Sequence, residues 1–213
     1  MRTHTTPESS KSSAPVSPGG VPGLPPKVTG LVLLVSGVLG LVPSFILAVE
    51  KYWLLTNPFY SPSCTLGETV SCLPVMNSWQ AEVFGFPNPY IGLVGFALVA
   101  ATGGALLGGA RLSGWYWGGL QAGVTLGTFF VGWLMSQSLF SIEALCPYCM
   151  LAWAAMFSAM WYVSLESLSR WGHQRSGGPP RLARTVLEHH GTVLLTWFVL
   201  IAGLVIVAAL NFS

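Results

Sequence analysis

Five long apolar stretches follow one another along the chain, separated by shorter polar segments. They cover residues 28–49, 90–110, 115–140, 146–165 and 192–210. Each has about 20 residues or more, which at a rise of 1.5 Å per residue is enough for a helix to cross the hydrocarbon core of a bilayer. The pattern therefore predicts an all-α membrane protein with five transmembrane helices.

A polar tail precedes the first apolar stretch, and charged and aromatic residues follow it. Residues 1–26 are rich in Ser, Thr, Pro and Gly with almost no large apolar side chains, so we predict a disordered tail. The 22 apolar residues after it exceed the core of a signal peptide and predict a retained helix, kinked at Pro43. The residues after this stretch are expected to anchor the helix end at the membrane surface: Glu50, Lys51, Tyr52 and Trp53.

The segment 54–88 is the one substantial stretch outside the predicted spans that has apolar character. Its apolar residues recur at roughly helical spacing among polar ones: Val75, Trp79, Val83 and Phe84. This spacing predicts a short amphipathic helix on the membrane surface, which could act as a lid. The alternative is a solvated connection that its aromatic residues merely anchor.

Glycines recur at four-residue intervals in two of the predicted spans. They are Gly104 and Gly108 in the second span and Gly119, Gly123 and Gly127 in the third. Small residues at this spacing let helix backbones approach closely in lipid, so we predict helix-packing positions rather than ligand contacts.

Composition supports a membrane protein and excludes several other classes. Of the 213 residues, 52% are hydrophobic and 8% are charged, against about 25% charged residues in soluble domains. The net charge of +2 is weak and dispersed, so no nucleic-acid partner is expected. The chain is instead expected to lie in membrane lipid.

The positions of the basic residues predict the orientation. Eight of the nine lie before the first span, between the second and third, or between the fourth and fifth: Arg2, Lys11, Lys27, Arg111, Arg170, Arg175, Arg181 and Arg184. The positive-inside rule places that side in the cytoplasm. We therefore expect a multi-pass protein of the cell membrane, with residues 1–26 and 169–190 cytoplasmic and the 54–88 loop external with Lys51.

The four cysteines form two close pairs, Cys64 with Cys72 and Cys146 with Cys149. If Cys146 opens the fourth helix, the helix dipole favours its thiolate, and Cys149 lies one turn deeper. We expect the Cys146 sulfur to face outward and the Cys149 sulfur inward. By the predicted orientation all four lie at the external face, where disulfides persist. A structural bridge, a metal half-site and idle thiols are the other readings of the Cys146 pair.

The order and spacing of these motifs resemble the vitamin K epoxide reductase family, specifically its bacterial disulfide-forming branch. The resemblance covers about residues 28–165. Cys64 and Cys72 are eight residues apart, and Ser78 follows six residues later. The run Phe86-Pro87-Asn88-Pro89-Tyr90-Ile91-Gly92 comes next, and Cys146-Pro147-Tyr148-Cys149 completes the set.

This resemblance implies a four-helix transmembrane bundle around a quinone, menaquinone or a related one. The fifth transmembrane helix is expected from its apolar stretch alone, since the family core does not account for residues 166–213. Cys146 and Cys149 would exchange electrons with the quinone, and Cys64 and Cys72 would be the shuttle pair. Ser78, Asn88 and Cys149 would lie near the quinone. The catalytic domain would cover residues 27–168, and the fifth helix would lie within 191–213.

The implied activity is that of a membrane thiol–quinone oxidoreductase that supports disulfide bond formation. The chain ends at Ser213, directly after the fifth predicted span, which leaves no room for the thioredoxin-like domain that is fused in some relatives. We therefore expect a separate DsbA-like thioredoxin-fold protein as the thiol partner. Trp153 replaces the tyrosine that vertebrate members have at this position, which leaves the selectivity for quinones or drugs open.

The expected mechanism is a relay of thiol–disulfide exchanges. A partner thiolate attacks Cys64, the released Cys72 attacks Cys146, and the freed Cys149 faces the quinone. Ser78 and Asn88 would donate hydrogen bonds to the developing oxyanion. The alternatives are a vitamin K quinone or epoxide reductase that uses thiols as reductant, and a non-catalytic subunit stapled by disulfides. The apolar setting argues against a four-thiol zinc site, so no metal is expected.

Overall fold

The computed structural model describes residues 26–57, 59–65, 67, 69–174 and 190–210. Regular structure in this part of the chain is helical, apart from one isolated bridge. The long helices are α1 (Pro26–Thr56), α3 (Pro89–Leu107), α4 (Gly114–Gln137), α5 (Pro147–Gln174) and α7 (His190–Leu210). The short elements are α2 (Leu73–Asn77), the 3₁₀ turn η1 (Trp79–Glu82) and the π-helical turn η2 (Ser138–Ile142). The predicted all-α membrane fold is confirmed.

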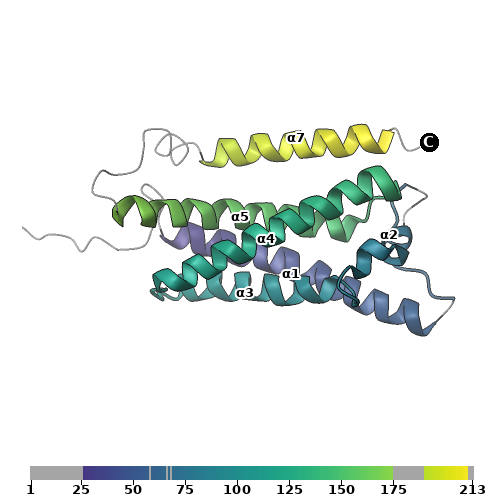
Figure 1. Ribbon diagram of the computed structural model, residues 1–213, viewed down its shortest axis with the longest axis horizontal. Coiled ribbons are helices and arrows are strands. Elements are labelled where there is room, and N and C mark those ends of the chain that lie inside the picture. Colours follow the sequence, from purple (N-terminus) through teal and green to yellow (C-terminus); the bar gives the residue numbers. More distant parts are fainter. Residues whose placement is uncertain (1–25, 58, 66, 68, 175–189, 211–213) are drawn as a thin grey trace, which may run out of the picture.

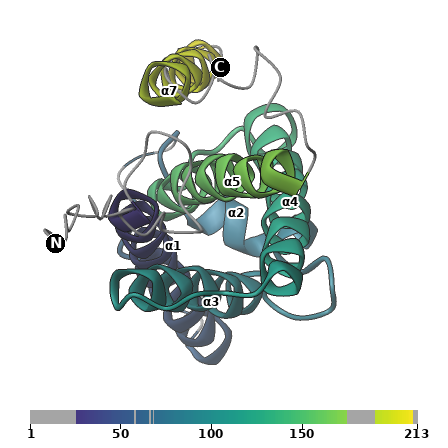
Figure 2. The same ribbon diagram turned by 90° about the vertical axis from the view of Figure 1, so that its left-hand side faces the viewer.

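Four of the long helices form a bundle. Helices α1, α3, α4 and α5 run side by side along the long axis (Figure 1). Seen end-on, these helices form the four sides of the bundle, and α7 lies outside it (Figure 2). The most extensive contacts join α1 to α3 and α5, and α4 packs against α5. The short helix α2 lies across one end of the bundle.

Among the described residues, four helical segments are long and apolar enough to cross a membrane. They are Lys27–Thr56, Pro89–Leu107, Pro147–Arg170 and Gly191–Leu210. Helix α4 occupies the place of the predicted third span and is not one of these four segments. Its role as a fifth span stays a prediction.

Close backbone contact between α1 and α3 explains their extensive packing. A Cβ atom added to Gly37 would lie 2.4 Å from the Ala100 nitrogen, and one added to Gly103 would lie 2.2 Å from the Leu34 nitrogen. Only glycine permits this approach, because any larger residue would push the two backbones apart.

The predicted packing glycines are mostly not in such contacts. Among the described residues, a Cβ atom at Gly104, Gly119 or Gly123 would meet no atom within 4 Å, and at Gly108 it would meet only carbonyls of the preceding turn. Gly127 alone faces a neighbouring helix closely, at 2.9 Å from the Met156 methyl carbon. The packing prediction was therefore wrong for most of these glycines, because four-residue spacing does not say where the neighbouring helix lies.

Three predicted helices differ from the structure in where they begin, end or break, and the first two differences matter for the site. Helix α1 continues to Thr56, so Glu50 and Lys51 lie within it, and both are buried instead of anchoring a helix end. The predicted surface helix is split into α2 and η1, because Ser78 between them has an extended backbone (φ −77°, ψ 150°). Helix α5 also runs past its predicted end, to Gln174.

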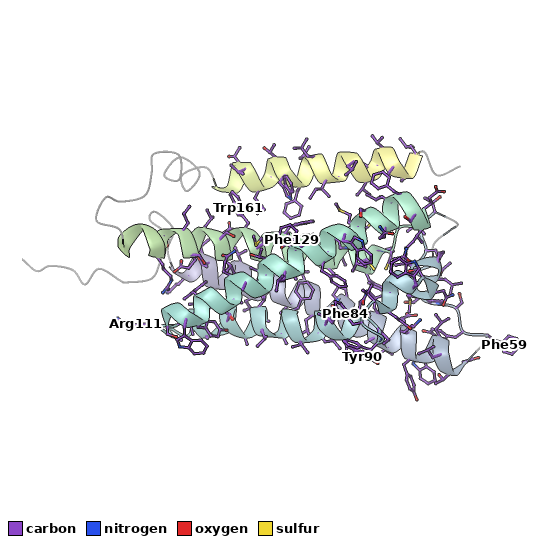
Figure 3. All side chains as sticks on the ribbon, in the orientation of Figure 1. Phe59, Phe84, Tyr90, Arg111, Phe129 and Trp161 are labelled. Atoms are coloured by element: carbon purple, nitrogen blue, oxygen red, sulfur yellow. A yellow bond between two sulfur atoms is a disulfide. The ribbon has the colours of Figure 1, made fainter. Side chains whose placement is uncertain are left out.

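The two ends of the bundle carry different features. Phe59, in the loop after α1, and Arg111, in the turn between α3 and α4, lie at opposite ends of the molecule (Figure 3). This agrees with the expected separation of Arg111 from the cysteine loop, and which end faces the cytoplasm stays a prediction. The predicted tail, most of the predicted 169–190 loop and the last three residues lie outside the described residues.

Candidate functional site

A short backbone pairing places the loop against the start of α5. The Ser71 N–H donates to the Leu145 carbonyl at 3.0 Å, and the Leu145 N–H donates to the Thr69 carbonyl at 2.9 Å. These bonds flank the isolated parallel bridge between Val70 and Leu145. Since Cys72 follows one partner and Cys146 follows the other, the pairing sets the two cysteines side by side.

The four cysteines meet at one end of the bundle. Cys64 and Cys72 form a disulfide, and Cys146 and Cys149 are free thiols. The sulfur atoms of Cys72 and Cys146 lie 3.1 Å apart. The contact therefore joins the loop pair to the C-x-x-C pair through one sulfur of each.

The loop covers the Cys146 thiol. Cys146 and Cys72 have no exposed surface, and Cys64 is 5% exposed. The expected directions agree with the structure, since Cys146 contacts the loop sulfur and Cys149 lines the cavity, but the expectation of an exposed Cys146 thiol was wrong because the loop folds back onto the end of α5. In this arrangement Cys72 is the sulfur positioned to exchange with Cys146.

The start of α5 favours the thiolate of Cys146. The Cys149 N–H points at the Cys146 sulfur, at 3.3 Å. The Cys149 thiol and the backbone N–H groups of Cys149 and Tyr148 hold the pKa of the Cys146 thiol below its ordinary value, against burial, which raises it. A more acidic thiol at this position leaves more readily when a bond between Cys72 and Cys146 is resolved by exchange.

A cavity of about 580 Å³ lies beneath the loop and is reached by Cys149. Its wall is predominantly apolar, with contributions from α1, α3, α4, α5 and the 75–88 segment. Ser78, Asn88 and Cys149, the three residues that the resemblance places near a quinone, share this cavity, and Trp153 lines it as well. Their roles in binding stay predictions.

The polar atoms of the cavity are few and differ in what they can offer a ligand. The Ser78 hydroxyl donates to the Val75 carbonyl at 2.7 Å, and the Asn88 amide donates to the Gln80 carbonyl at 2.6 Å. Asn88 Oδ1 is buried and accepts no hydrogen bond from any described residue. An apolar wall with a few placed polar atoms fits a quinone, a flat apolar ring that carries oxygen atoms at opposite edges.

The comparison with protein families agrees with this site. A model of the vitamin K epoxide reductase family matches residues 31–164, which include all four cysteines and the whole wall of the cavity. The chain belongs to the vitamin K epoxide reductase family. No curated protein matches the chain. Family membership makes it a membrane thiol–quinone oxidoreductase in general terms, while α7 lies outside the matched residues.

In this member of the vitamin K epoxide reductase family, the segment 73–88 forms a cap over the cavity. Its aromatic residues pack on α4, with 5.9 Å between the ring centroids of Trp79 and Trp133 and 5.5 Å between those of Phe84 and Phe130. The Gln80 amide also donates to the Gln137 side chain at 3.2 Å. The predicted lid over the site is present as two short helical turns.

Two site residues were interpreted from the sequence as membrane-surface anchors. The buried Glu50 carboxylate accepts hydrogen bonds from the Tyr60 hydroxyl at 3.0 Å and from the Ser63 backbone at 3.2 Å. Lys51 Nζ donates to the Met76 carbonyl at 2.8 Å and pairs with the Glu82 carboxylate at 2.9 Å. The sequence signal for these buried contacts was the pair of adjacent opposite charges at the end of an apolar span. Anchoring a helix end at the membrane surface does not require an acidic and a basic residue side by side.

Proposed function

We propose that this protein takes electrons from a separate extracytoplasmic thioredoxin-fold protein of the DsbA type and passes them to a membrane quinone, thereby supporting disulfide bond formation. The observation that carries the proposal is the 3.1 Å contact between the Cys72 and Cys146 sulfurs. It links an oxidised loop pair to a reduced pair whose second member, Cys149, lines an apolar cavity.

The described redox state corresponds to one stage of this cycle. A partner dithiol reduces the Cys64–Cys72 disulfide and leaves oxidised, while the loop gains two thiols. Cys72 then attacks Cys146 of a Cys146–Cys149 disulfide and frees Cys149 as a thiolate, and Cys64 attacks Cys72 to close the loop disulfide again. The result is an oxidised loop above a reduced C-x-x-C pair, which is the arrangement in the structure.

The cavity residues carry the last stage. A bound quinone supplies a two-electron acceptor, and Cys146 and Cys149 return to a disulfide as they release two electrons and two protons to it. Cys149 lines the cavity, Asn88 Oδ1 offers a hydrogen-bond acceptor, and Trp153 contributes a flat apolar wall. The cap covers one end of this space, and exclusion of water there would strengthen polar interactions inside it.

Quinone-dependent oxidation of a reduced thioredoxin-fold protein tests the proposal. The purified chain in detergent should oxidise many equivalents of the partner when 2,3-dimethyl-1,4-naphthoquinone is present, and about one equivalent per disulfide when it is absent. Replacement of Cys149 by Ala should abolish the turnover and leave exchange between the partner and the loop measurable. Absence of quinone-dependent turnover in the unsubstituted chain would favour a non-catalytic role for the disulfide.

A further inference from the structure

Lys51 is a buried cation at the wall of the cavity. It is 8% exposed, and it lines the cavity together with Cys149 and Asn88. Among the described residues that form this wall, it is the one with a charged side chain. A charge is costly to bury beside apolar surface unless partners or a ligand stabilise it, so its position calls for an account of its contacts.

Within the part of the chain that the structure describes, the contacts of Lys51 use two of its three N–H donors. Its acceptors are the Met76 carbonyl in α2 and the Glu82 carboxylate in η1, at 2.8 Å and 2.9 Å. An ammonium group has three donors, so one remains for a further acceptor. Both acceptors belong to the cap, so Lys51 joins the cap to the cavity wall of which it is part.

We propose that Lys51 is a quinone-binding residue, whose third N–H donates a hydrogen bond to a ring oxygen. This inference rests on the proposed function and adds a residue to it. When Cys146 and Cys149 close to a disulfide, two electrons and two thiol protons leave on the reduced quinone. Lys51 stays protonated throughout, and its charge stabilises the negative charge that develops on the nearby oxygen.

The other polar groups of the cavity leave room for such a donor. The Ser78 hydroxyl donates to a backbone carbonyl, and the unpartnered atom of Asn88 is an acceptor. An acceptor and a cationic donor in one cavity suit a ring that carries carbonyl oxygens before reduction and hydroxyl groups after it. Hydrogen bonds from a charged donor are about twice as strong as neutral ones, so Lys51 is the strongest donor available there.

A simpler role for Lys51 would be to latch the cap through its ion pair with Glu82. Two substitutions separate the roles. Lys51→Met removes the charge and keeps the length of the apolar stem, whereas Glu82→Gln breaks the ion pair and leaves the ammonium group in place. If Lys51 only latches the cap, both variants should lose similar affinity for the quinone. If its ammonium group binds the quinone, only Lys51→Met should lose affinity.

Binding of 2,3-dimethyl-1,4-naphthoquinone provides the readout, since its methyl groups block addition of thiols to the ring. Quenching of tryptophan fluorescence measures the Kd, and Trp153→Phe assigns the part of the signal that comes from the cavity. We expect Lys51→Met to weaken binding by about tenfold or more and Lys51→Arg to remain within about threefold. Glu82→Gln should bind as tightly as the unsubstituted chain or more tightly.

Kinetics give a second readout that a purely structural role would not produce. Lys51→Met should raise the KM for the quinone and lower kcat, while the rate of exchange between the partner and the loop stays unchanged. Equal weakening of binding in Lys51→Met and Glu82→Gln, or unchanged binding in Lys51→Met, would overturn the inference. Failure of the unsubstituted chain to bind the quinone would instead overturn the proposed function.

Discussion

Glu50 is expected to hold the arm of the loop that carries Cys64. Its carboxylate accepts hydrogen bonds from the Tyr60 hydroxyl and from the backbone and hydroxyl of Ser63, the residue before Cys64. The Ser63 hydroxyl also lies 3.4 Å from the Tyr148 hydroxyl, within the C-x-x-C segment. The carboxylate therefore ties α1 to this arm, which lies near the start of α5.

Substitution of Glu50 by Gln keeps the shape and one acceptor oxygen and removes the charge. Hydrogen bonds to a charged acceptor contribute about 1.5–3 kcal/mol each, against about 0.5–1.5 kcal/mol for neutral ones. Weakening two or three of them should destabilise the closed arm by about 1–3 kcal/mol, which corresponds to a roughly 5- to 150-fold increase in its open population. The free energy concerns the arm and not the bundle, so the Tm of the helices should change little.

Reduction of the Cys64–Cys72 disulfide by a water-soluble phosphine measures this opening, because both sulfurs are buried when the arm is closed. The rate for Glu50→Gln should exceed that of the unsubstituted chain by the same factor. Tyr60→Phe is the matched control, since it removes one donor and leaves the carboxylate with Ser63, and it should give a smaller increase. We call the hydrogen bonds from Tyr60 and Ser63 to the Glu50 carboxylate the Glu50 clasp. An unchanged reduction rate in Glu50→Gln would show that this clasp does not hold the arm closed.

The same clasp predicts a dependence on pH. Burial, together with the hydrogen bond to Glu50, raises the pKa of Tyr60 above its ordinary value of 10.0. A raised pKa means that the contribution of the neutral hydroxyl is fully present below about pH 10 and is lost as the pH rises through the raised value. Reduction of the loop disulfide should therefore accelerate in that alkaline range, beyond the general effect of pH, and Tyr60→Phe should lack this step.

Three further predictions concern the relay, the packing and the orientation. Cys149→Ala should accumulate a Cys72–Cys146 bond, which mass spectrometry of the non-reduced digest detects, and a bond from the other loop cysteine to Cys146 would reverse the assigned order. Gly37→Ala should lower stability by about 1–3 kcal/mol, because its Cβ would meet the α3 backbone, whereas Gly104→Ala should be neutral or slightly stabilising in the same thermal unfolding assay. An impermeant thiol reagent, added to intact cells after reduction, should label a loop cysteine, and full protection until the membrane is broken would invert the predicted orientation.

The features that the sequence predicted well are those that depend on local pattern. Apolar runs of about 20 residues located the five long helices, because length and composition alone determine whether a segment can cross lipid. The two cysteine pairs and the segment 86–92 identified the family, which the match over residues 31–164 confirms. The order and spacing of these motifs along the chain are enough to identify the family, so this prediction does not depend on contacts between distant residues.

The features that the sequence did not predict depend on how the loop folds back. Glu50 and Lys51 are buried because residues 60–63 and the cap supply partners that lie 10 to 31 positions further along the chain. The burial of Cys146 has the same origin, since Cys72 covers it from 74 positions away. Anchors at the membrane surface and an exposed thiol are sound expectations for helix ends that no loop covers. Here the loop covers these helix ends and buries Glu50, Lys51 and Cys146.

The two clasps at the end of α1 hold different parts of the loop. Glu50 binds the arm before Cys64, and Lys51 binds the cap after Cys72. Under the proposed function, the Cys64 arm would open toward the partner while Lys51 and the aromatic contacts on α4 keep the cap over the cavity. Such an order of movement would expose the disulfide without admitting water to Cys149, so the two exchanges of the relay would take place in separate environments joined by the Cys72–Cys146 contact.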